Sequence, residues 1–429
     1  MIFDTITLIL GAAIIILAVL TSLLSPFRRA DVKTLRSFDV EKPNDDVLSP
    51  LRSESAPADR AETMRSLDVE APSDDLSISQ HLNISTSQPL TLLITVQQKQ
   101  AQMLERHLPQ FLSQDYAPGF EVVVVAEKGD SDTEDVLNRY AGNPLLYSTY
   151  IPDSSRYMSR KKLAITLGVK AAHNEWIVMT DAFCSPSGNH WLKAIASHIG
   201  PADASTSPNL IIGYSNYDDE ARPYYRFERL QQACYTMREA RRGKAYRAMG
   251  CNVAFRKSEF IAGDGFRGNL EHTRGEYDFL VNKFSQRRST AVANEPDAWI
   301  IDDAPTRHEW RSRHIYYMHT RKYLARSFRH RLLPFIDELA LHLCFLAIIG
   351  IGVFAGLTSR WILLGAAVVA LVIAVCMRTS FARKTVRAYG EDIASWRLYP
   401  YELSGIWHKL YQHLRYWRAD KAGFTSHKV

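Results

Sequence analysis

One acidic residue, Asp181, occupies the position in the sequence that is best suited to bind a ligand. It follows the apolar run WIVM at residues 176–179 and Thr180. Such a run is typical of a buried strand, and open α/β sheets bind ligands beyond the carboxyl ends of their strands. Asp181 could instead cap a helix that begins near Ser187. Its place directly after the apolar run favours the ligand site.

Two further acids, Glu276 and Asp278, follow a glycine-rich segment at residues 263–275. A carboxylate held in a cleft can accept a proton from a substrate hydroxyl. The other interpretation is that both acids are solvated charges, since the first turn of a helix favours acidic residues in any case. Lys161 and Lys162 could bind phosphate groups, or could simply cover a helix surface.

The strands and helices that must position these residues alternate between residues 90 and 326. We expect strands at residues 90–96, 120–126 and 176–180, and helices at residues 102–112, 132–140 and 160–172. Strand–helix alternation at this spacing predicts an α/β fold with a largely parallel sheet covered by helices.

Three apolar segments are long enough to cross a bilayer as helices, at residues 5–24, 332–357 and 361–377. Positive charges follow the first segment instead of preceding it, which favours an uncleaved anchor over a signal peptide. Basic residues after the first and third segments place these sides in the cytoplasm. Asp337 and Glu338, at the cytoplasmic start of the second segment, are expected to be interfacial, although buried acids there would be functional candidates.

Two segments outside the central domain have their own patterns. Residues 28–88 are rich in Ser, Asp, Glu and Pro and are predicted to be a disordered linker, in which LRSFDVEKPNDD (35–46) recurs as MRSLDVEAPSDD (64–75). The repeat reads as a duplication within a tether, or as a docking motif for a partner. The tail at residues 397–418 is predicted to be an amphipathic helix in the headgroup region, or else a helix packed back on the soluble domain.

Composition restricts the class of protein further. The chain has 429 residues, 46% of them apolar, which is enough for one large domain with appendages. The net charge of +6 comes without a basic run interleaved with aromatics in the central region, so it indicates membrane orientation and no nucleic-acid partner. Five cysteines without a CxxC pair indicate a reducing compartment, and Cys184 and Cys251 are expected to be small packing residues.

Five stretches within residues 90–323 together resemble family 2 glycosyltransferases of the membrane-anchored bacterial type. They are QDY (114–116), EKGDSD (127–132), SRKKLAITLGVKAA (159–172), TDAFCSP (180–186), and GCNVAFRKSEF (250–260) with GDGF (263–266) and GEYDFLVNK (275–283). The resemblance implies an α/β fold, namely a GT-A, Rossmann-like nucleotide-sugar-binding domain with three transmembrane helices. The implied divisions are an anchor (1–27), a linker (28–88), the GT-A domain (89–330), a helical hairpin (331–378) and a cytosolic basic amphipathic tail (379–429).

The same resemblance implies an inverting transfer of a sugar, hexosyl in type, from a nucleotide-sugar donor to a lipid-linked or glycan acceptor. The reaction would occur at the cytoplasmic face of the bacterial inner membrane, in polysaccharide or cell-envelope biosynthesis. Membrane lipids and other envelope-biosynthesis proteins are the further expected partners. A nucleoside diphosphate leaving group requires positive charge, from Mg²⁺ or Mn²⁺ on carboxylates or from nearby Lys and Arg.

The resemblance also assigns roles to single residues. Asp181 would hold the donor diphosphate and the Mg²⁺ or Mn²⁺ ion, and either Glu276 or Asp278 would be the base. The remaining donor-side residues are Glu127, Asp132, Lys161 and Lys162, and the acceptor-side residues are Gly250, Asn252, Trp310 and Arg313.

The chain departs from the family pattern at several positions. Phe183 replaces the second acid of the Asp-x-Asp metal motif, Lys99 replaces an early Asn, and Tyr277 separates the two candidate bases. The Gln-x-x-Arg-Trp motif of processive members has no counterpart, because the nearest stretch places Arg313, Tyr316 and Tyr317 at those positions. These departures argue against a polymerising synthase. They leave open a second hypothesis, a catalytically silent GT-A subunit that scaffolds a polysaccharide-synthesis partner.

Overall fold

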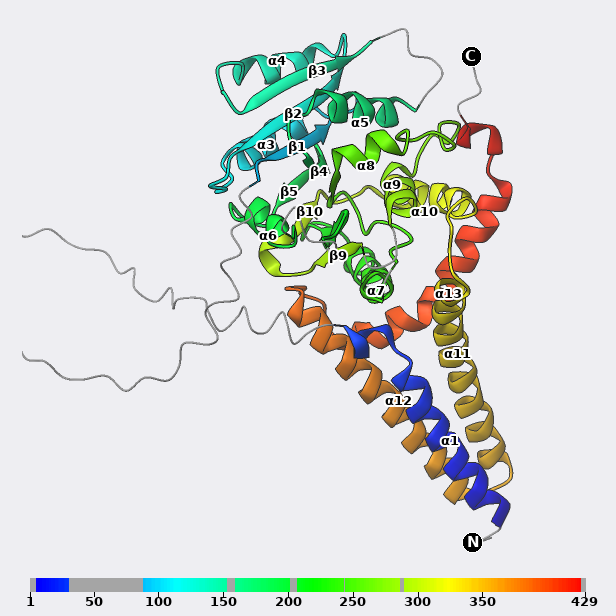
Figure 1. Cartoon of the computed structure of the whole chain (residues 1–429). Coiled ribbons are helices and arrows are strands. Elements are labelled where there is room, and N and C mark those ends of the chain that lie inside the picture. Colours follow the sequence, from blue (N-terminus) through cyan, green and yellow to red (C-terminus); the bar gives the residue numbers. More distant parts are fainter. Residues whose placement is uncertain are drawn as a thin grey trace, which may run out of the picture.

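The computed structural model describes residues 5–30, 88–152, 159–200, 207–242, 244–285 and 289–425. Both copies of the duplicated segment, and all of the predicted linker except its two ends, lie outside these residues. The described residues form an α/β domain that stands on a stalk of three long helices (Figure 1).

A seven-stranded mixed sheet forms the centre of the domain, in the order β3-β2-β1-β4-β8-β6-β9. β3, β2, β1 and β4 are mutually parallel, whereas β8 runs antiparallel to both β4 and β6. β6 and β9 pair in parallel, so β8 is the one reversed strand of this sheet, and the prediction of a largely parallel sheet is confirmed except at β8. The strands are β1 (Leu90–Thr95), β2 (Phe120–Glu127), β3 (Leu146–Ile151), β4 (Trp176–Asp181), β6 (Leu210–Gly213), β8 (Val253–Arg256) and β9 (Thr290–Ala293).

The reversed direction of β8 matters for the site. Val253, the first residue of β8, pairs with Met179 near the end of β4. Residues that precede β8 therefore lie at the same sheet edge as residues that follow β4. The loop around Gly250 and Cys251 is thus brought next to Asp181 by the strand pairing itself.

Helices cover both faces of the sheet, and successive side chains of β1 pack against helices on opposite faces. Leu92 and Ile94 pack with Leu104 of α3 on one face, while Leu93 packs with Ile165 of α5 on the other. Parallel strands buried on both faces read as continuous apolar runs for this reason. The covering helices are α3 (Ala101–Leu112), α4 (Ser131–Arg139), α5 (Arg160–Ala171), α6 (Trp191–Ser197), α8 (Lys257–Ala262) and α9 (Glu276–Phe284).

A small second sheet and two helices close the domain beside this edge. The sheet has the order β5-β10-β7. Its strands are β5 (Cys184–Pro186), β10 (Ile300–Asp302) and β7 (Ser215–Tyr217), and the helices are α7 (Pro223–Arg241) and α10 (Arg307–Thr320). Short 3₁₀ helices among the described residues are η1 (Pro26–Arg29), η3 (Pro296–Ala298) and η4 (Lys421–Phe424).

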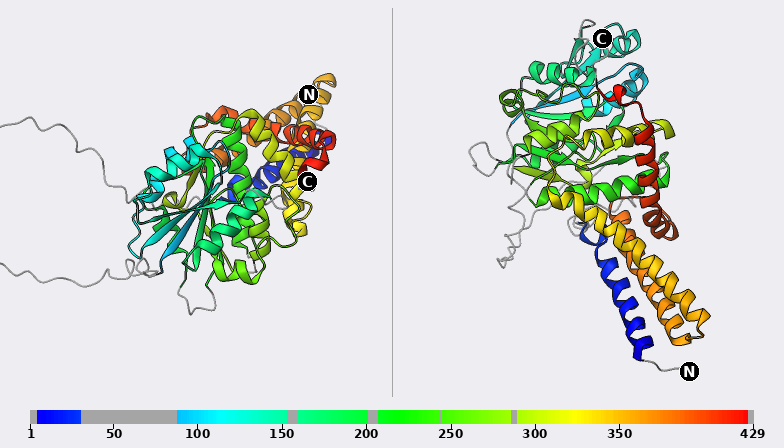
Figure 2. Two further views of the ribbon diagram at one scale, coloured as in Figure 1. Left: turned by 90° about the horizontal axis from the view of Figure 1, so that it is seen from above. Right: turned by 90° about the vertical axis from the view of Figure 1, so that its right-hand side faces the viewer.

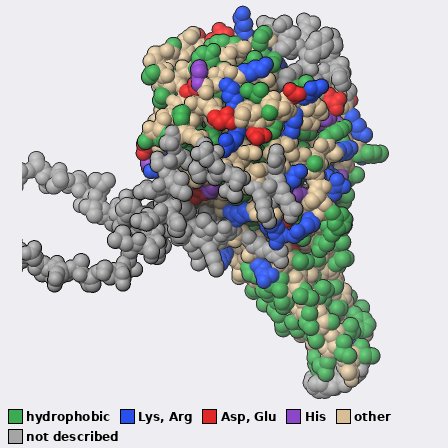
Figure 3. All heavy atoms as spheres, in the orientation of Figure 1, with side chains coloured by type: hydrophobic (Ala, Val, Ile, Leu, Met, Phe, Trp, Pro, Cys, Tyr) green, Lys and Arg blue, Asp and Glu red, His purple; other side chains and the backbone are tan. Residues whose placement is uncertain are grey.

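The stalk contains three helices that are long and apolar enough to cross a membrane: α1 (Thr5–Leu23), α11 (Phe328–Leu357) and α12 (Trp361–Ala388). All three were predicted, but α11 begins before residue 332 because Ser327 and His330 form a capping box. The outer surface of the stalk is largely hydrophobic, and Lys and Arg side chains lie where it meets the domain (Figure 3).

The tail forms α13 (Ser395–Arg418), which runs from the stalk along the side of the domain (Figure 2). Leu398 and Glu402 are buried, whereas Trp407 and Trp417 are 65% and 74% exposed. The helix therefore packs on the domain and the stalk with one face and presents aromatic side chains on the other.

A buried group of charges joins the stalk to the domain. The Arg378 guanidinium of α12 donates to Glu402 of α13 at 2.5 Å and lies 3.2 Å from Asp337 of α11. It also donates to the carbonyl oxygen of Thr21 in α1 at 3.0 Å, and the Tyr235 hydroxyl of α7 donates to Asp337 at 2.7 Å. The structure thus buries Asp337, which the sequence placed at an interface, while Glu338 pairs with Lys409 of α13.

Candidate active site

A cleft of about 520 Å³ opens beside the carboxyl end of β4. Its walls come from the loop before β8, the start of α9, the second sheet and α10. Seven of the sequence-predicted site residues line it: Lys161, Asp181, Gly250, Glu276, Asp278, Trp310 and Arg313. Four others lie outside its lining: Glu127, Asp132, Lys162 and Asn252.

Asp181 lies at the floor of the cleft and is 2% exposed. The Thr95 hydroxyl, from the paired position on β1, donates to its Oδ1 at 2.6 Å. The Lys161 ammonium donates to its Oδ2 at 2.6 Å. Both carboxylate oxygens are therefore engaged, one by a neutral donor and one by a cation.

Lys161 stays charged in this position. Burial would lower the pKa of Lys161, but the negative charges of Asp181 and Glu276 outweigh it and raise the pKa. The rings of Tyr277 and Phe183 flank the ammonium, with centroids at 5.0 and 5.8 Å. An ammonium has three N–H groups, so the contact with Asp181 leaves others for a ligand in the cleft.

The neighbouring lysine is used differently, because adjacent residues of a helix point in different directions. Lys162 is fully buried and donates to the carbonyl oxygens of Asn269 and His272. Burial lowers the pKa of Lys162 to about 8, against an opposing effect of Glu276. Lys162 thus ties α5 to the loop before α9, and its ammonium is not directed into the cleft.

The two candidate bases lie in the first turn of α9, which follows Gly275 in the left-handed region with a φ of 95°. Glu276 accepts from the Ser159 hydroxyl at 3.4 Å and is near both Lys161 and Lys162. Asp278 accepts from the Ala248 N–H at 3.2 Å and lies 3.4 Å from Arg247. Burial raises the pKa of Asp278, although Arg247 opposes the shift.

The opposite wall contains charged residues that the sequence analysis did not identify. Asp302, at the end of β10, is bound by the Arg229 guanidinium at 2.8 Å and lies 3.7 Å from Arg313. The signal was present, since Asp302 follows the apolar run at residues 299–301 just as Asp181 follows its own run. The run is short, however, and the sequence offers nothing that marks Arg229 as its partner.

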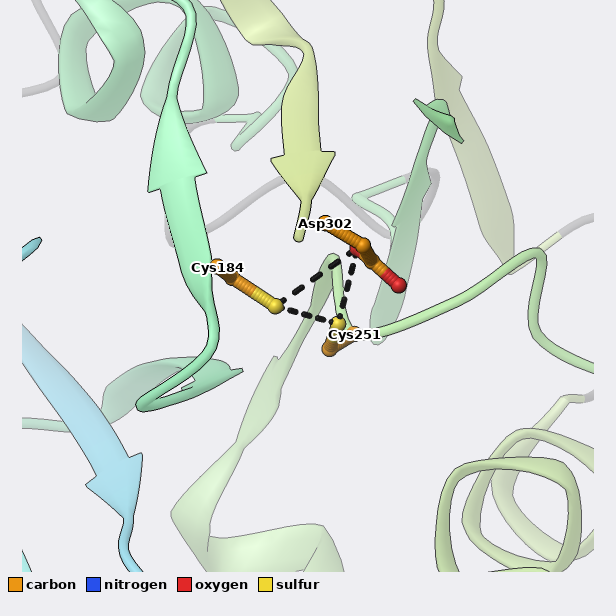
Figure 4. A group of neighbouring side chains, drawn as sticks. All are labelled: Cys184, Cys251 and Asp302. Carbon is orange, nitrogen blue, oxygen red and sulfur yellow. Dashed lines mark hydrogen bonds between the residues drawn. The ribbon is translucent and has the colours of Figure 1, made fainter. Parts of the chain in front are cut away.

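Cys184, Cys251 and Asp302 form the one cluster among the described residues with metal-ligand atoms close together (Figure 4). The two Sγ atoms are 2.6 Å apart, and Asp302 Oδ1 lies 3.5 and 3.2 Å from them. Burial raises the pKa of both thiols, whereas metals bind thiolates. Arg229 already neutralises Asp302, so this donor set does not fit a cation.

Two of the predicted acceptor-side residues, Gly250 and Asn252, have structural roles of their own. A Cβ on Gly250 would lie 2.0 Å from Ser215 Oγ and 2.3 Å from an Arg229 nitrogen, so any larger residue would displace these side chains. Asn252 is buried and donates to the carbonyl oxygens of Tyr214 and Ala298. Its amide therefore holds the second sheet against the first.

Two predicted donor-side acids lie away from the cleft. Glu127, the last residue of β2, is buried and pairs with Arg160 at 2.9 Å. Asp132 is exposed in the first turn of α4. Glu127 ends β2 and Asp132 follows it, on the side of β1 opposite to β4.

No protein-family model matches the sequence, and no curated protein matches it. Among solved structures, the chain is similar to the mannosyltransferase PcManGT from Pyrobaculum calidifontis in complex with GDP-Man and Mn²⁺, with 18% identity, 71% of this chain and 88% of that chain covered, and a TM-score of 0.43. It is also similar to S. aureus TarS 1–349 in complex with UDP-GlcNAc, with 12% identity, 74% and 91% coverage and a TM-score of 0.38.

Proposed function

We propose that this protein is a membrane-anchored glycosyltransferase that moves a sugar, with inversion, from a nucleotide-sugar donor to a lipid-linked or glycan acceptor. The observation that carries the proposal is the Asp181–Lys161 pair, which is buried at a strand end and yet faces a cleft. A charged pair that opens into a cavity of this size is suited to a small anionic ligand. We also propose that the protein is a family 2 glycosyltransferase, as the resemblance of its sequence motifs implies.

The donor diphosphate is proposed to lie over Lys161. Its free N–H groups can donate to phosphate oxygens, and exposed Arg274 lines the mouth of the cleft without a carboxylate partner among the described residues. These charges stabilise the nucleoside diphosphate as the glycosidic bond breaks. Glu127 and Asp132 stay predicted contacts of the donor base and ribose, at the adjoining end of β2.

A divalent cation was also predicted at Asp181. The residues present do not fit a two-carboxylate site, because Phe183 replaces the second acid and both oxygens of Asp181 already accept hydrogen bonds. We therefore assign the neutralising charge to Lys161 and derive no step through a metal. The prediction of Mg²⁺ or Mn²⁺ is decided by comparing turnover in EDTA with turnover in added Mn²⁺.

Asp278 is the proposed base. A base must take the proton of the acceptor hydroxyl while that oxygen forms its bond to the anomeric carbon. Glu276 lies beside Lys161 and Lys162, the cations of the donor side. Asp278 lies on the Arg247 side, and burial raises its pKa, which makes it a stronger base than an ordinary aspartate. The glycosidic electrons leave with the diphosphate, and the proton moves to Asp278.

The three apolar helices are proposed to cross a bacterial inner membrane, with the α/β domain in the cytoplasm. The domain lies at one end of the stalk, so a bilayer around the stalk would lie directly beside the domain. Transfer to a membrane-bound acceptor requires this arrangement. Basic residues such as Arg28, Arg383 and Arg387 follow α1 or lie at the end of α12 nearest the domain, in keeping with the positive-inside rule.

A second candidate is a catalytically silent subunit that binds a partner of polysaccharide synthesis. It is favoured by the loss of the second metal acid at Phe183. This candidate predicts that Asp181→Ala leaves the cellular phenotype intact. A nucleotide that binds without turnover would support it.

The test uses the purified full chain in detergent with a panel of UDP- and GDP-sugars. Release of the nucleoside diphosphate is measured with and without a membrane lipid extract. Turnover of one donor by the wild type, lost in Asp181→Asn and retained in the exposed control Asp135→Asn, is the expected result. An absence of turnover with every donor, with and without Mn²⁺, contradicts the enzyme.

A further inference from the structure

A second concave site, which we call the arginine groove, lies between the start of α7, α10 and α13. It encloses about 780 Å³. Four arginines contribute to its lining, namely Arg222, Arg307, Arg311 and Arg415, and the other lining side chains are mainly aromatic. Trp310 is the one lining residue that was also a candidate site residue from the sequence, and no sequence pattern indicated a groove here.

The charge of the groove is not neutralised by the protein. No Asp or Glu lines it, and its four arginines form no salt bridge within the described part of the chain. Arg311 and Arg415 instead lie 5.9 and 5.8 Å from the centroid of the Tyr411 ring. By contrast Arg226, one turn from Arg222, pairs with both Asp219 and Glu391. A concave site with unpaired arginines is suited to an anion, above all to phosphate.

The groove and the cleft share a wall. The rings of Tyr225 and Trp310 stack with centroids 4.3 Å apart and planes 10° apart, and both residues line both cavities. Tyr224 of the groove stacks on His408 of α13 at 4.4 Å. A ligand held in the groove therefore lies against the same aromatic pair that lines the cleft.

The groove also lies beside the upper end of the stalk. α13, which forms one wall, is joined to α12 through Glu402 and Arg378 and to α11 through Lys409 and Glu338. Trp407 lines the groove and is largely exposed. If the stalk crosses a bilayer, the groove opens at the level of the lipid headgroups, where tryptophan and arginine are favourable.

We propose that the arginine groove binds the phosphate or diphosphate of the lipid that carries the acceptor. Arg311 and Arg415 bind the phosphate oxygens, the apolar chain follows Trp407 toward the stalk, and the carried hydroxyl group extends past Trp310 toward Asp278. This assignment rests on the proposed glycosyl transfer for the identity of the acceptor, but the binding of a lipid phosphate does not require a donor or turnover.

The test measures lipid binding to the full chain by native mass spectrometry after release from detergent. Three probes separate the sources of the anion: dioleoyl phosphatidic acid has phosphate and tails, dioleoylglycerol has the same tails only, and inorganic pyrophosphate has no tails. The wild type binds phosphatidic acid at least about tenfold more tightly than either of the others. Arg311→Gln/Arg415→Gln removes this preference to within about twofold, since two charge-assisted contacts are lost.

Two controls make the result specific. Arg397→Gln/Arg418→Gln removes the same charge from α13 outside the groove lining and keeps the preference. Asp181→Asn, in the cleft, also keeps the preference for phosphatidic acid. The lipid-binding result can therefore be interpreted even if the proposed glycosyl transfer does not occur.

Three outcomes overturn the proposal. The first is equal binding of phosphatidic acid and dioleoylglycerol by the wild type. The second is a preference that survives in Arg311→Gln/Arg415→Gln or disappears equally in the control pair. The third is pyrophosphate binding as tight as that of phosphatidic acid, which would indicate a site for a free anion.

Discussion

Two buried clusters of opposite charges, the Lys161–Asp181 pair and the group around Arg378, differ in whether they open into a cleft. At the cleft floor, Lys161 and Asp181 form a pair with free N–H groups on the cavity side. At the stalk junction, Arg378 is enclosed by Asp337 and Glu402 and lines neither cavity. The first cluster can exchange partners with a ligand, whereas the charges of the second are paired with one another inside the protein.

The difference between the two clusters shows that buried ion pairs can serve either ligand binding or stability. Burial of charge is unfavourable unless the charge is paired and hydrogen-bonded, so both clusters must be fully formed to be stable. In the stalk junction, the cluster fixes four helices, α1, α11, α12 and α13, at one point. In the cleft, the pairing with Asp181 keeps the Lys161 ammonium charged and able to bind an anionic ligand. Mutations should therefore separate into effects on activity and effects on stability.

The largest effect is expected at the base. Asp278→Asn should lower kcat by about 10²–10⁴-fold, because a general base contributes on this order. Glu276→Gln, two residues away, should lower kcat less, since we assign it to the orientation of the lysines. Donor turnover of both variants in detergent is the measurement. A larger loss in Glu276→Gln would exchange the two roles.

The next effect is on stability at the junction. Arg378→Met should lower the free energy of unfolding by about 3–5 kcal/mol, because Asp337 and Glu402 would stay buried without their cation. Arg383→Met, on the exposed side of the same helix, should change it little. Thermal unfolding in detergent compares the two. If Arg378→Met is as stable as Arg383→Met, the junction is not the enclosed cluster described above.

The adjacent lysines of α5 test the comparison within one helix turn. Lys161→Met should lower turnover by about 10²–10³-fold, as expected for a lost donor to a developing charge. Lys162→Met should lower stability by about 1–3 kcal/mol, because two buried carbonyl oxygens lose their donor. The prediction is wrong if the two variants show the same pattern.

The smallest effect concerns pH. Burial raises the pKa of Asp278, and only its deprotonated form can accept a proton. Turnover should therefore fall, as pH decreases, at a pH above the ordinary aspartate pKa of about 3.9. The raised pKa of Lys161 means that its charge is not lost below the ordinary lysine range. A pH profile of kcat/KM whose acid limb persists unchanged in the residual activity of Asp278→Asn assigns that limb to another group.

The sequence predicted the parts of the fold that depend on long apolar runs. β1, β2 and β4 were expected within one residue or so at each end, and so were the three stalk helices, apart from the extensions of α11 and α12. The three-residue strands β5, β7 and β10 were not predicted, because three residues are too few to show an alternation of apolar and polar residues. The antiparallel direction of β8 depends on the excursion through α7, which no local pattern records.

The candidate site was predictable to a similar degree. Asp181 and the α9 acids were found because they follow recognisable elements. Asp302, Arg229 and the arginine groove depend on contacts between segments far apart in the chain, such as α10 with α13. Lys162 shows the converse: its spacing was right, and only the direction of its side chain distinguished it from Lys161.

The most direct measurement is a calorimetric titration of the purified full chain with UDP and with GDP, in EDTA and again with Mn²⁺. The account predicts that the wild type binds one of these nucleotides in EDTA, that Asp181→Asn and Lys161→Met weaken binding at least about tenfold, and that Asp135→Asn does not. Binding of neither nucleotide under either condition, or equal binding by the wild type and Lys161→Met, would contradict it.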